Sequence, residues 1–261
     1  MLSQPASGPA LDDLRAELHA HEDALFERVK LEAEAGARLV VWSEVGAFVL
    51  RDEEQAFEER AASMARENRV HLVTGVAVFM PGEGYYENLL IAFDSTGTRL
   101  ARYHKARPVP GDPERGADPA IPVTNTVFGR LAGAVCFDAD FPSLIRRAGQ
   151  QGAQLLVIPS SDWRAIDPVH TRMALVRGIE NGCSVVRITH QGLSAAADRQ
   201  GRILAATDFF RTRPVVMVAQ VPVGGRRTLY PRAPDLLPCL CVGVLGVAAV
   251  LRPVFRQNVA K

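Results

Sequence analysis

Apolar and polar residues follow two different periods along the chain. Over residues 11–35, apolar side chains recur every three or four positions with charged residues between them, as in an amphipathic helix. The same period predicts helices over residues 52–68, 142–151 and 169–181. Short apolar runs bounded by Gly, Pro, Asn or Asp predict strands. The expected strands are residues 38–42, 70–79, 88–94, 99–104, 129–136, 155–158, 183–189 and 193–198. Helices and strands alternate throughout, which indicates an α/β fold.

The two ends of the chain differ from the part between them. Residues 1–10 are rich in Ser, Pro, Gly and Ala and are expected to form a flexible N-terminus. Residues 236–251 carry no charge and are followed by basic residues. A membrane-spanning helix needs about 17–25 apolar residues, so this run lies between a spanning helix and a buried or interfacial element. We therefore predict one folded domain over residues 11–230, and a hydrophobic, candidate transmembrane segment with a basic tail over residues 231–261.

The composition is that of an ordinary globular chain. It has 261 residues, 48% of them hydrophobic and 23% charged, which excludes a disordered or collagen-like protein. The formal net charge is +1, so no basic surface for nucleic acid is expected. The four cysteines contain no C-x-x-C pair and no spacing typical of zinc ligands. We therefore expect neither a disulfide framework nor a metal site.

Three reactive side chains, Glu44, Lys105 and Cys136, each stand at the end of a predicted strand. Lys105 is also the only lysine between Lys30 and the last residue, in a chain whose cations are otherwise arginines. Strand ends are where α/β folds gather catalytic groups. A carboxylate, an ammonium and a thiol suffice for acyl transfer. The carboxylate takes the thiol proton, and the thiolate attacks a carbonyl or nitrile carbon. The ammonium stabilises the oxyanion. The neighbouring cation is expected to lower the pKa of the thiol.

The segments around these residues resemble the carbon–nitrogen hydrolase (nitrilase) superfamily, whose members carry a Glu-Lys-Cys triad in this chain order. The matching segments are VVWSE ending at Glu44, RYHKARPVPG around Lys105, GAVCFDADFP around Cys136, and then GAQLLVIPSSDW, HTRMALVRGIENG and DRQGRILA. The resemblance implies a four-layer α-β-β-α sandwich, with Glu44 as general base, Lys105 as oxyanion stabiliser and Cys136 as nucleophile. It implies no metal and no organic cofactor.

Within the superfamily the chain looks most like the catalytic domain of apolipoprotein N-acyltransferase. The segments LVRGIENG and TLYPRAPDLLPCLCVGV carry that likeness, and the second leads into the uncharged run at residues 236–251. In such enzymes a phospholipid acyl chain passes to the cysteine, and the N-terminal amine of a lipoprotein then attacks the thioester. The likeness therefore implies an enzyme associated with the cell membrane through residues 236–251.

Two other functions stay open at this stage. A free-standing amidase or nitrilase, located in the cytoplasm, would act on a small amide with water as the acceptor. A catalytically inactive relative would serve as a binding module. Members of the superfamily often pair, so a homodimer is a further expectation.

Further residues are expected beside the triad. The family has a second glutamate in the loop after the lysine, and either Asp112 or Glu114 could fill that position, Glu114 having the longer side chain. The backbone N–H of Phe137 is expected to assist the oxyanion. Asp138 and Trp163 are expected as accessory or substrate-binding residues.

Overall fold

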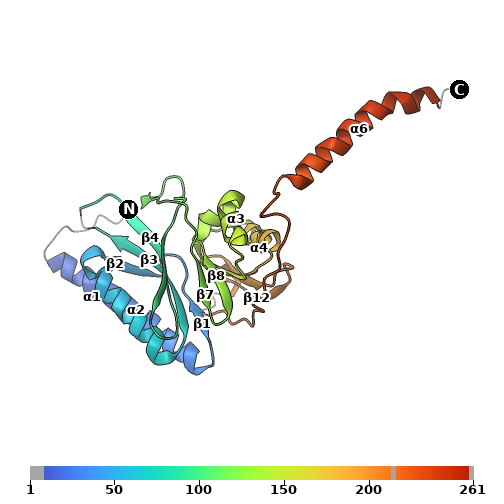
Figure 1. Cartoon of the computed structure of the whole chain (residues 1–261). Coiled ribbons are helices and arrows are strands. Elements are labelled where there is room, and N and C mark those ends of the chain that lie inside the picture. Colours follow the sequence, from blue (N-terminus) through green and yellow to red (C-terminus); the bar gives the residue numbers. More distant parts are fainter. Residues whose placement is uncertain (1–8, 81, 213–215, 259–261) are drawn as a thin grey trace.

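The computed structural model of the chain contains two six-stranded sheets, packed face to face with helices on their outer sides (Figure 1). Helices α1 (Pro9–Glu34) and α2 (Glu54–Asn68) cover the first sheet. Helices α3 (Pro142–Gln150) and α4 (Val169–Asn181) cover the second. These four layers form an α-β-β-α sandwich, so the predicted fold class is confirmed.

The first half of the chain builds the first sheet. Its strands are β1 (Leu39–Val41), β2 (Ala47–Leu50), β3 (His71–Phe79), β4 (Tyr86–Phe93), β5 (Arg99–His104) and β6 (Glu114–Arg115). The strand order is β1-β3-β4-β5, and β6 pairs with β4. β1 and β2 both pair in parallel with β3, each with a different stretch of it. The loop between β1 and β2 therefore leaves the sheet beside the middle of β3, and this loop carries Glu44.

The second half builds the second sheet. Its strands are β7 (Val123–Thr126), β8 (Gly129–Gly133), β9 (Leu155–Ser161), β10 (Ser184–His190), β11 (Leu193–Ala197) and β12 (Ile203–Asp208), in the order β12-β11-β10-β9-β8-β7. β8, β9 and β10 run parallel to one another. The carboxyl ends of parallel strands meet at one edge of a sheet, where ligands and catalytic groups gather. The 3-10 helix η2 (Cys136–Asp140) follows β8 at that edge.

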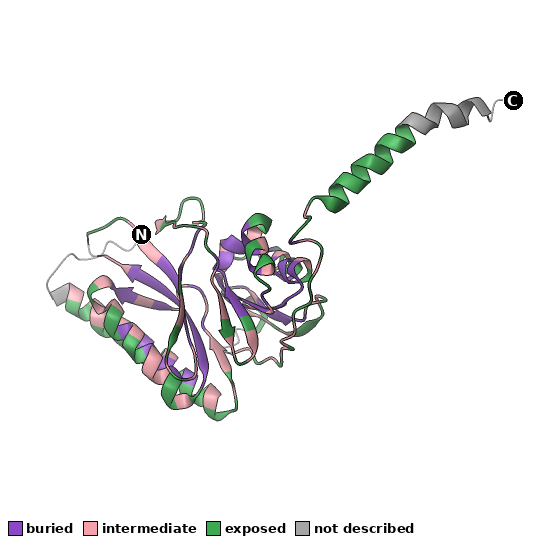
Figure 2. Cartoon of the chain, in the orientation of Figure 1, coloured by how far each residue is buried: buried purple, intermediate pink, exposed green. Residues whose placement is uncertain are grey.

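The side chains of β4 show how the layers are joined. Successive residues of a strand point to opposite faces of its sheet. Leu89 and Ile91 accordingly pack under α1 and α2, whereas Leu90 and Ala92 pack against the second sheet. Both faces of the central strands are buried (Figure 2). The sandwich thus holds the two sheets rigidly against each other, which fixes the loops at their ends.

Four strands were not predicted from the sequence, and one of them, β6, has only two residues and lies in a segment expected to be a loop. β7 and β12 are the two edge strands of the second sheet, and most of their side chains are partly or fully exposed, so no apolar run marks them. β2 is short and is separated from β1 only by the loop that carries Glu44. The first helix also starts earlier than expected, at Pro9 rather than at residue 11.

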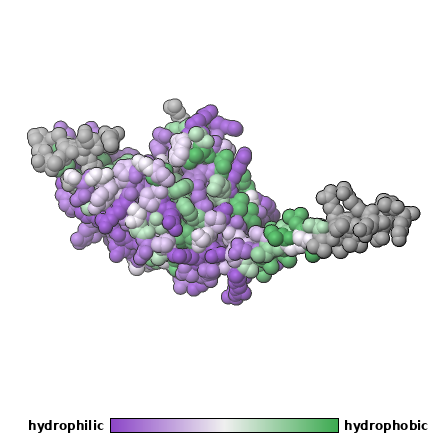
Figure 3. Space-filling view, turned by 90° about the horizontal axis from the view of Figure 1, so that it is seen from above, coloured by the Kyte–Doolittle hydropathy of each residue, from purple (hydrophilic) through white to green (hydrophobic). Residues whose placement is uncertain are grey.

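The last helix, α6 (Leu236–Asn258), projects away from the sandwich (Figures 1 and 2). The structure describes residues 9–80, 82–212 and 216–258, so most of the expected flexible N-terminus lies outside it. The candidate span at residues 236–251 lies in α6, and its first turns are exposed and hydrophobic (Figure 3). Within the described ranges, no helix combines the length and the apolar character that crossing a membrane requires.

Gly75 in β3 leaves room for the loop that carries Glu44. A Cβ atom on Gly75 would lie 2.1 Å from the carbonyl oxygen of Ser43 and 3.0 Å from Cα of Glu44. We expect Gly75→Ala to lower the free energy of unfolding by about 1–3 kcal/mol, as overpacking does elsewhere. Gly84→Ala is the control, since nothing lies within 4 Å of its Cβ position, and it should stay within about 0.5 kcal/mol of wild type. Urea unfolding measures both, and equal midpoints for the two variants would contradict this account of Gly75.

Candidate active site

Three buried reactive side chains stand where strands of both sheets end. Glu44 lies in the loop after β1, Lys105 directly follows β5, and Cys136 begins η2. Their exposed fractions are 4%, 1% and 2%, respectively. The backbone N–H of Glu44 donates to the carbonyl oxygen of Ser160 in β9 at 3.3 Å, which ties the loop of the first sheet to the second sheet. An acid, an amine and a thiol from distant parts of the chain therefore share one interior site.

Lys105 is held between two carboxylates. Its Nζ donates to Oε1 of Glu44 at 2.8 Å and to Oε1 of Glu114 at 3.0 Å. The amide nitrogen of Asn88 donates to the same two oxygens, at 2.8 and 2.7 Å. Burial alone would lower the pKa of Lys105, but the charges of Glu44 and Glu114 outweigh it and raise that pKa above its usual value. The amine is therefore a fixed, fully protonated cation.

The structure distinguishes the two acids that the sequence left open. Glu114 lies in β6, opposite Tyr86 of β4, whose hydroxyl donates to it at 3.0 Å. Its side chain is buried against Lys105. Asp112 is exposed two residues earlier in the same loop. Glu114 is thus the acid in contact with the lysine.

Cys136 has an unusual backbone conformation. Its φ angle is +43°, in the left-handed region that residues other than glycine rarely adopt. Such conformations persist where the surrounding structure enforces them, and they cluster at active sites. The Sγ–H of Cys136 donates to the carbonyl oxygen of Ser161, at the end of β9, at 3.5 Å. The sharp turn after β8 therefore aims the sulfur at the end of the neighbouring strand.

The pKa of the Cys136 thiol differs from our expectation. Burial raises this pKa well above its usual value, and the charge of Glu44 raises it further, whereas Lys105 and Arg187 lower it. The prediction of a lowered pKa was therefore wrong, because the cost of burying a thiolate exceeds the effect of the cations. A thiol in this state needs a base before it can attack. Glu44 is the carboxylate whose charge acts on it most strongly.

Asp138 connects the segments around Lys105 and Cys136 by hydrogen bonds. It is fully buried, and its oxygens accept hydrogen bonds from the hydroxyl of Tyr103 at 2.9 Å and the backbone N–H groups of Arg107 and Val135 at 2.9 and 3.1 Å. Burial raises the pKa of Asp138 to about 6, against the opposing effect of these donors. Asp138 therefore joins the loop after Lys105 to the turn that carries the cysteine, and its oxygens are occupied by the protein itself.

Phe137 and Trp163 lie at the boundary of the buried region. The ring of Phe137 packs edge-on against Phe141 with centroids 5.2 Å apart. Its backbone N–H belongs to the first turn of η2, where such groups have no partner within the helix. Trp163 follows β9 and is 48% exposed, so its indole is available at the surface beside the strand end.

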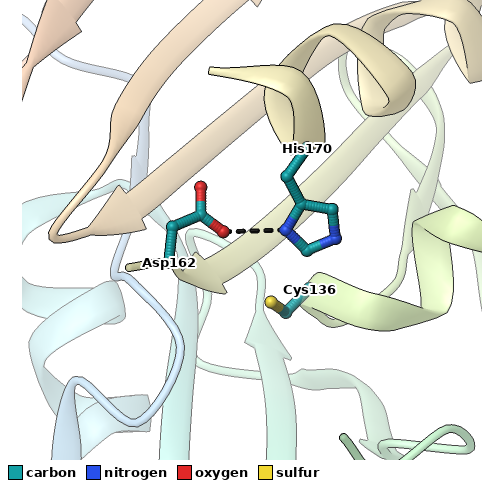
Figure 4. Close-up of side chains that lie close together, drawn as sticks. All are labelled: Cys136, Asp162 and His170. Carbon is teal, nitrogen blue, oxygen red and sulfur yellow. Dashed lines mark hydrogen bonds and ion pairs between the residues drawn. The ribbon is translucent and has the colours of Figure 1, made fainter. Parts of the chain in front are cut away.

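A second group of charged side chains lies on the other side of the cysteine, and sequence reasoning missed it. Asp162 follows β9, and His170 lies in the first turn of α4 (Figure 4). Arg187 lies in β10. Nδ1 of His170 lies 2.8 Å from Oδ1 of Asp162, and the guanidinium of Arg187 contacts both oxygens of Asp162 at 2.8 Å. On its other side, Nε2 of His170 lies 2.8 Å from Oδ1 of Asp140, in η2. His170 was available as a signal, since it opens one of the matched segments, but only the fold brings its partners together.

This group has some features of a metal site. Potential ligand atoms of Cys136, Asp162 and His170 all lie within 4.8 Å of one another. However, Arg187 already neutralises both oxygens of Asp162, and His170 faces a carboxylate at each ring nitrogen. A metal ion would have to displace a buried guanidinium and a proton. These residues therefore fit a buried ion-pair cluster better than they fit a metal.

Comparisons with known proteins agree with this geometry. The family model for carbon-nitrogen hydrolase matches residues 13–229. The chain is 29% identical to an apolipoprotein N-acyltransferase of Geobacter metallireducens over 90% of its length, and 25% identical to one of Shewanella oneidensis over 83%. These matches cover 50% and 48% of the two relatives, so the chain spans about half of their length.

Solved structures show the same fold. A mutant of the Nesterenkonia AN1 amidase from the nitrilase superfamily superimposes with a TM-score of 0.69 at 21% identity, over 78% of this chain and 85% of that one. The predicted resemblance is confirmed, since the family model covers most of the sandwich and includes all the residues of the candidate active site. The chain belongs to the carbon–nitrogen hydrolase family of enzymes.

Proposed function

We propose that the chain catalyses acyl transfer through a thioester on Cys136, with Glu44 as general base and Lys105 as oxyanion stabiliser. The observation that carries this proposal is the buried contact of 2.8 Å between Lys105 and Glu44, in a site whose two charges both act on the thiol. Glu114 and Asn88 hold the pair in place. The arrangement supplies a nucleophile, a base for its proton and a cation for the developing negative charge.

The reaction divides into two half-reactions. Glu44 takes the thiol proton as the sulfur attacks the acyl carbonyl carbon, and the ammonium of Lys105 and the backbone N–H of Phe137 stabilise the oxyanion. Collapse of the tetrahedral intermediate forms the thioester, and the leaving group departs with the proton from Glu44. An acceptor amine or water then loses its proton to Glu44 as it attacks the thioester. The second collapse breaks the carbon–sulfur bond, and the sulfur takes the proton back from Glu44, which restores the thiol.

For the acyl donor and acceptor, we propose a phospholipid and the N-terminal amine of a lipoprotein, at a membrane surface. Relatives that match 90% and 83% of this chain carry the name apolipoprotein N-acyltransferase. The start of α6 supports a lipid surface independently, because Leu237, Val242 and Leu245 are each about 70% exposed. Exposed apolar surface of this kind marks contact with a protein or membrane partner.

The second candidate is hydrolysis of a small amide with water as the acceptor. The amidase fold match supports it, as does the nearly complete burial of Cys136, which favours a small substrate. A catalytically inactive binding module would share the fold but show neither reaction.

A product assay tests the proposal and separates these candidates. The full chain is incubated with phosphatidylethanolamine vesicles and a lipopeptide whose N-terminal cysteine has a free amine, and separately with short aliphatic amides. Acyl transfer predicts lysophospholipid and an N-acylated peptide. Ammonia from the short amides alone would favour the hydrolase. Absence of all products, with the protein folded, would overturn the proposed function and favour the binding module.

A further inference from the structure

His170 links the two segments that touch the sulfur of Cys136. One of its ring nitrogens faces Asp140, the last residue of η2, and Cys136 is the first residue of that same helix. The other nitrogen faces Asp162, which directly follows Ser161, the residue whose carbonyl oxygen accepts the Sγ–H. The imidazole therefore joins the turn that carries the nucleophile to the strand end at which the nucleophile points.

The surrounding charges hold this imidazole in its charged form. A neutral imidazole carries a proton on one nitrogen only, so the lone pair of its other nitrogen would lie 2.8 Å from a carboxylate oxygen. Burial and Arg187 lower the pKa of His170, but the contacts with Asp140 and Asp162 outweigh them and raise it to about 9. The charged groups facing the ring are Asp140 from η2, Asp162 from the end of β9 and Arg187 from β10, so the cluster is electrically balanced when His170 is protonated.

The same geometry excludes a second catalytic base. A Cys-His-Asp arrangement could deprotonate the thiol only through a free imidazole nitrogen. Nδ1 of His170 is hydrogen-bonded to Asp162, Nε2 lies 2.8 Å from Oδ1 of Asp140 as an ion pair without hydrogen-bond geometry, and the Sγ–H is directed at the carbonyl oxygen of Ser161. His170 thus acts on Cys136 through the backbone segments it joins and through its charge.

We propose that His170 is a positioning residue for Cys136, whose imidazolium, bridging Asp140 and Asp162, fixes the strained turn of the nucleophile and keeps a positive charge beside the sulfur. This inference rests on the proposed role of Cys136 as the nucleophile. Without the imidazolium, Asp140 would lose its partner, and the backbone at φ +43° would lose one of the contacts that enforce it. The sulfur would also face uncompensated negative charge, which favours the thiol over the thiolate.

The test compares His170→Gln with His71→Gln in the full chain. His71 is the matched control, because it is also a buried histidine, but it packs against Phe128 in another part of the sandwich. Two quantities are measured from pH 6 to 10: the rate of alkylation of Cys136 by iodoacetamide, followed by peptide mass mapping, and kcat and KM with the substrate found active. For His170→Gln at pH 7 we expect alkylation about tenfold slower, because loss of the imidazolium should raise the pKa of the thiol by about one unit. We also expect kcat about 10²-fold lower with KM little changed.

The pH dependence separates positioning by charge from a merely structural role. His170 loses its proton as the pH rises through about 9, so the ratio of wild-type to His170→Gln rates should be largest below pH 8 and should approach one above pH 9. Asp140→Asn, which keeps the histidine and removes one carboxylate, should move that midpoint to lower pH. If His170→Gln does not fold, Asp140→Asn can be measured in its place. A ratio that stays constant with pH in both variants would overturn the proposal.

Failure of this inference differs from failure of the proposed function. If Cys136→Ala is inactive while His170→Gln and Asp140→Asn match the wild type in alkylation and turnover, only the role of His170 is wrong. If Cys136→Ala retains turnover, the proposed nucleophile is wrong. The alkylation measurement needs no substrate, so it tests His170 in either case.

Discussion

Replacing Cys136 with alanine should abolish acyl transfer, with a fall in kcat of about 10⁴-fold or more, because no other group in the site can form the covalent intermediate. The variant should remain folded, since the change removes one buried sulfur atom from a packed turn. Activity is followed with the substrate identified by the product assay, and folding by circular dichroism and thermal unfolding.

Cys183→Ala is the matched control for this prediction. Cys183 is as deeply buried as Cys136, and burial raises the pKa of its thiol to about 12, but no charged side chain is among the causes of that shift. Its replacement should lower stability slightly and leave kcat near the wild-type value. Loss of activity in both variants to the same extent would point to a shared effect on folding and would remove the support for Cys136 as the nucleophile.

Replacing Lys105 with methionine should abolish turnover and also lower the free energy of unfolding by about 3–5 kcal/mol. The stability loss arises because Glu44 and Glu114 would be left buried without their cation. Protonation relieves two unpaired carboxylates, so the destabilisation should be larger at pH 7 than at pH 4. Urea unfolding at both pH values, together with an activity assay, measures these effects.

Two further variants make this prediction specific. Lys30→Met changes a lysine that is half exposed, and we expect it to stay within about 0.5 kcal/mol of wild type. The double variant Lys105→Met/Glu114→Gln should regain part of the lost stability, since one unpaired charge is removed, while remaining inactive. If the double variant were no more stable than Lys105→Met, the ion pairing described here would not account for the loss.

The main features of the fold and the site could be predicted from the sequence because they depend on local patterns. Apolar runs marked the central strands, and Glu44, Lys105 and Cys136 stood out because each ends such a run. The order of the matched segments then indicated the four-layer sandwich. Edge strands such as β7 and β12 were not predicted, because partly exposed strands need no apolar run.

The parts that could not be predicted depend on contacts between distant elements. The longer side chain of Glu114 favoured it slightly over Asp112, but its contact with Lys105 depends on the pairing of β6 with β4. The sequence analysis did not single out Arg187, and only the fold places it against Asp162. The predicted shift in the pKa of Cys136 had the wrong direction, because the neighbouring charges can be inferred from the sequence but the depth of burial cannot. Such quantities follow from tertiary packing, which a single strand or helix does not contain.

The central claim is that an acyl group becomes attached to the sulfur of Cys136. Intact-mass spectrometry of the full chain, after brief incubation with phospholipid vesicles or with short amides and rapid acid quenching, tests it most directly. We predict an added acyl mass that maps to the peptide containing Cys136, is released by hydroxylamine as expected of a thioester, and is absent from Cys136→Ala. An active wild-type protein that shows no such adduct under single-turnover conditions, or an adduct that persists in Cys136→Ala, would contradict the account.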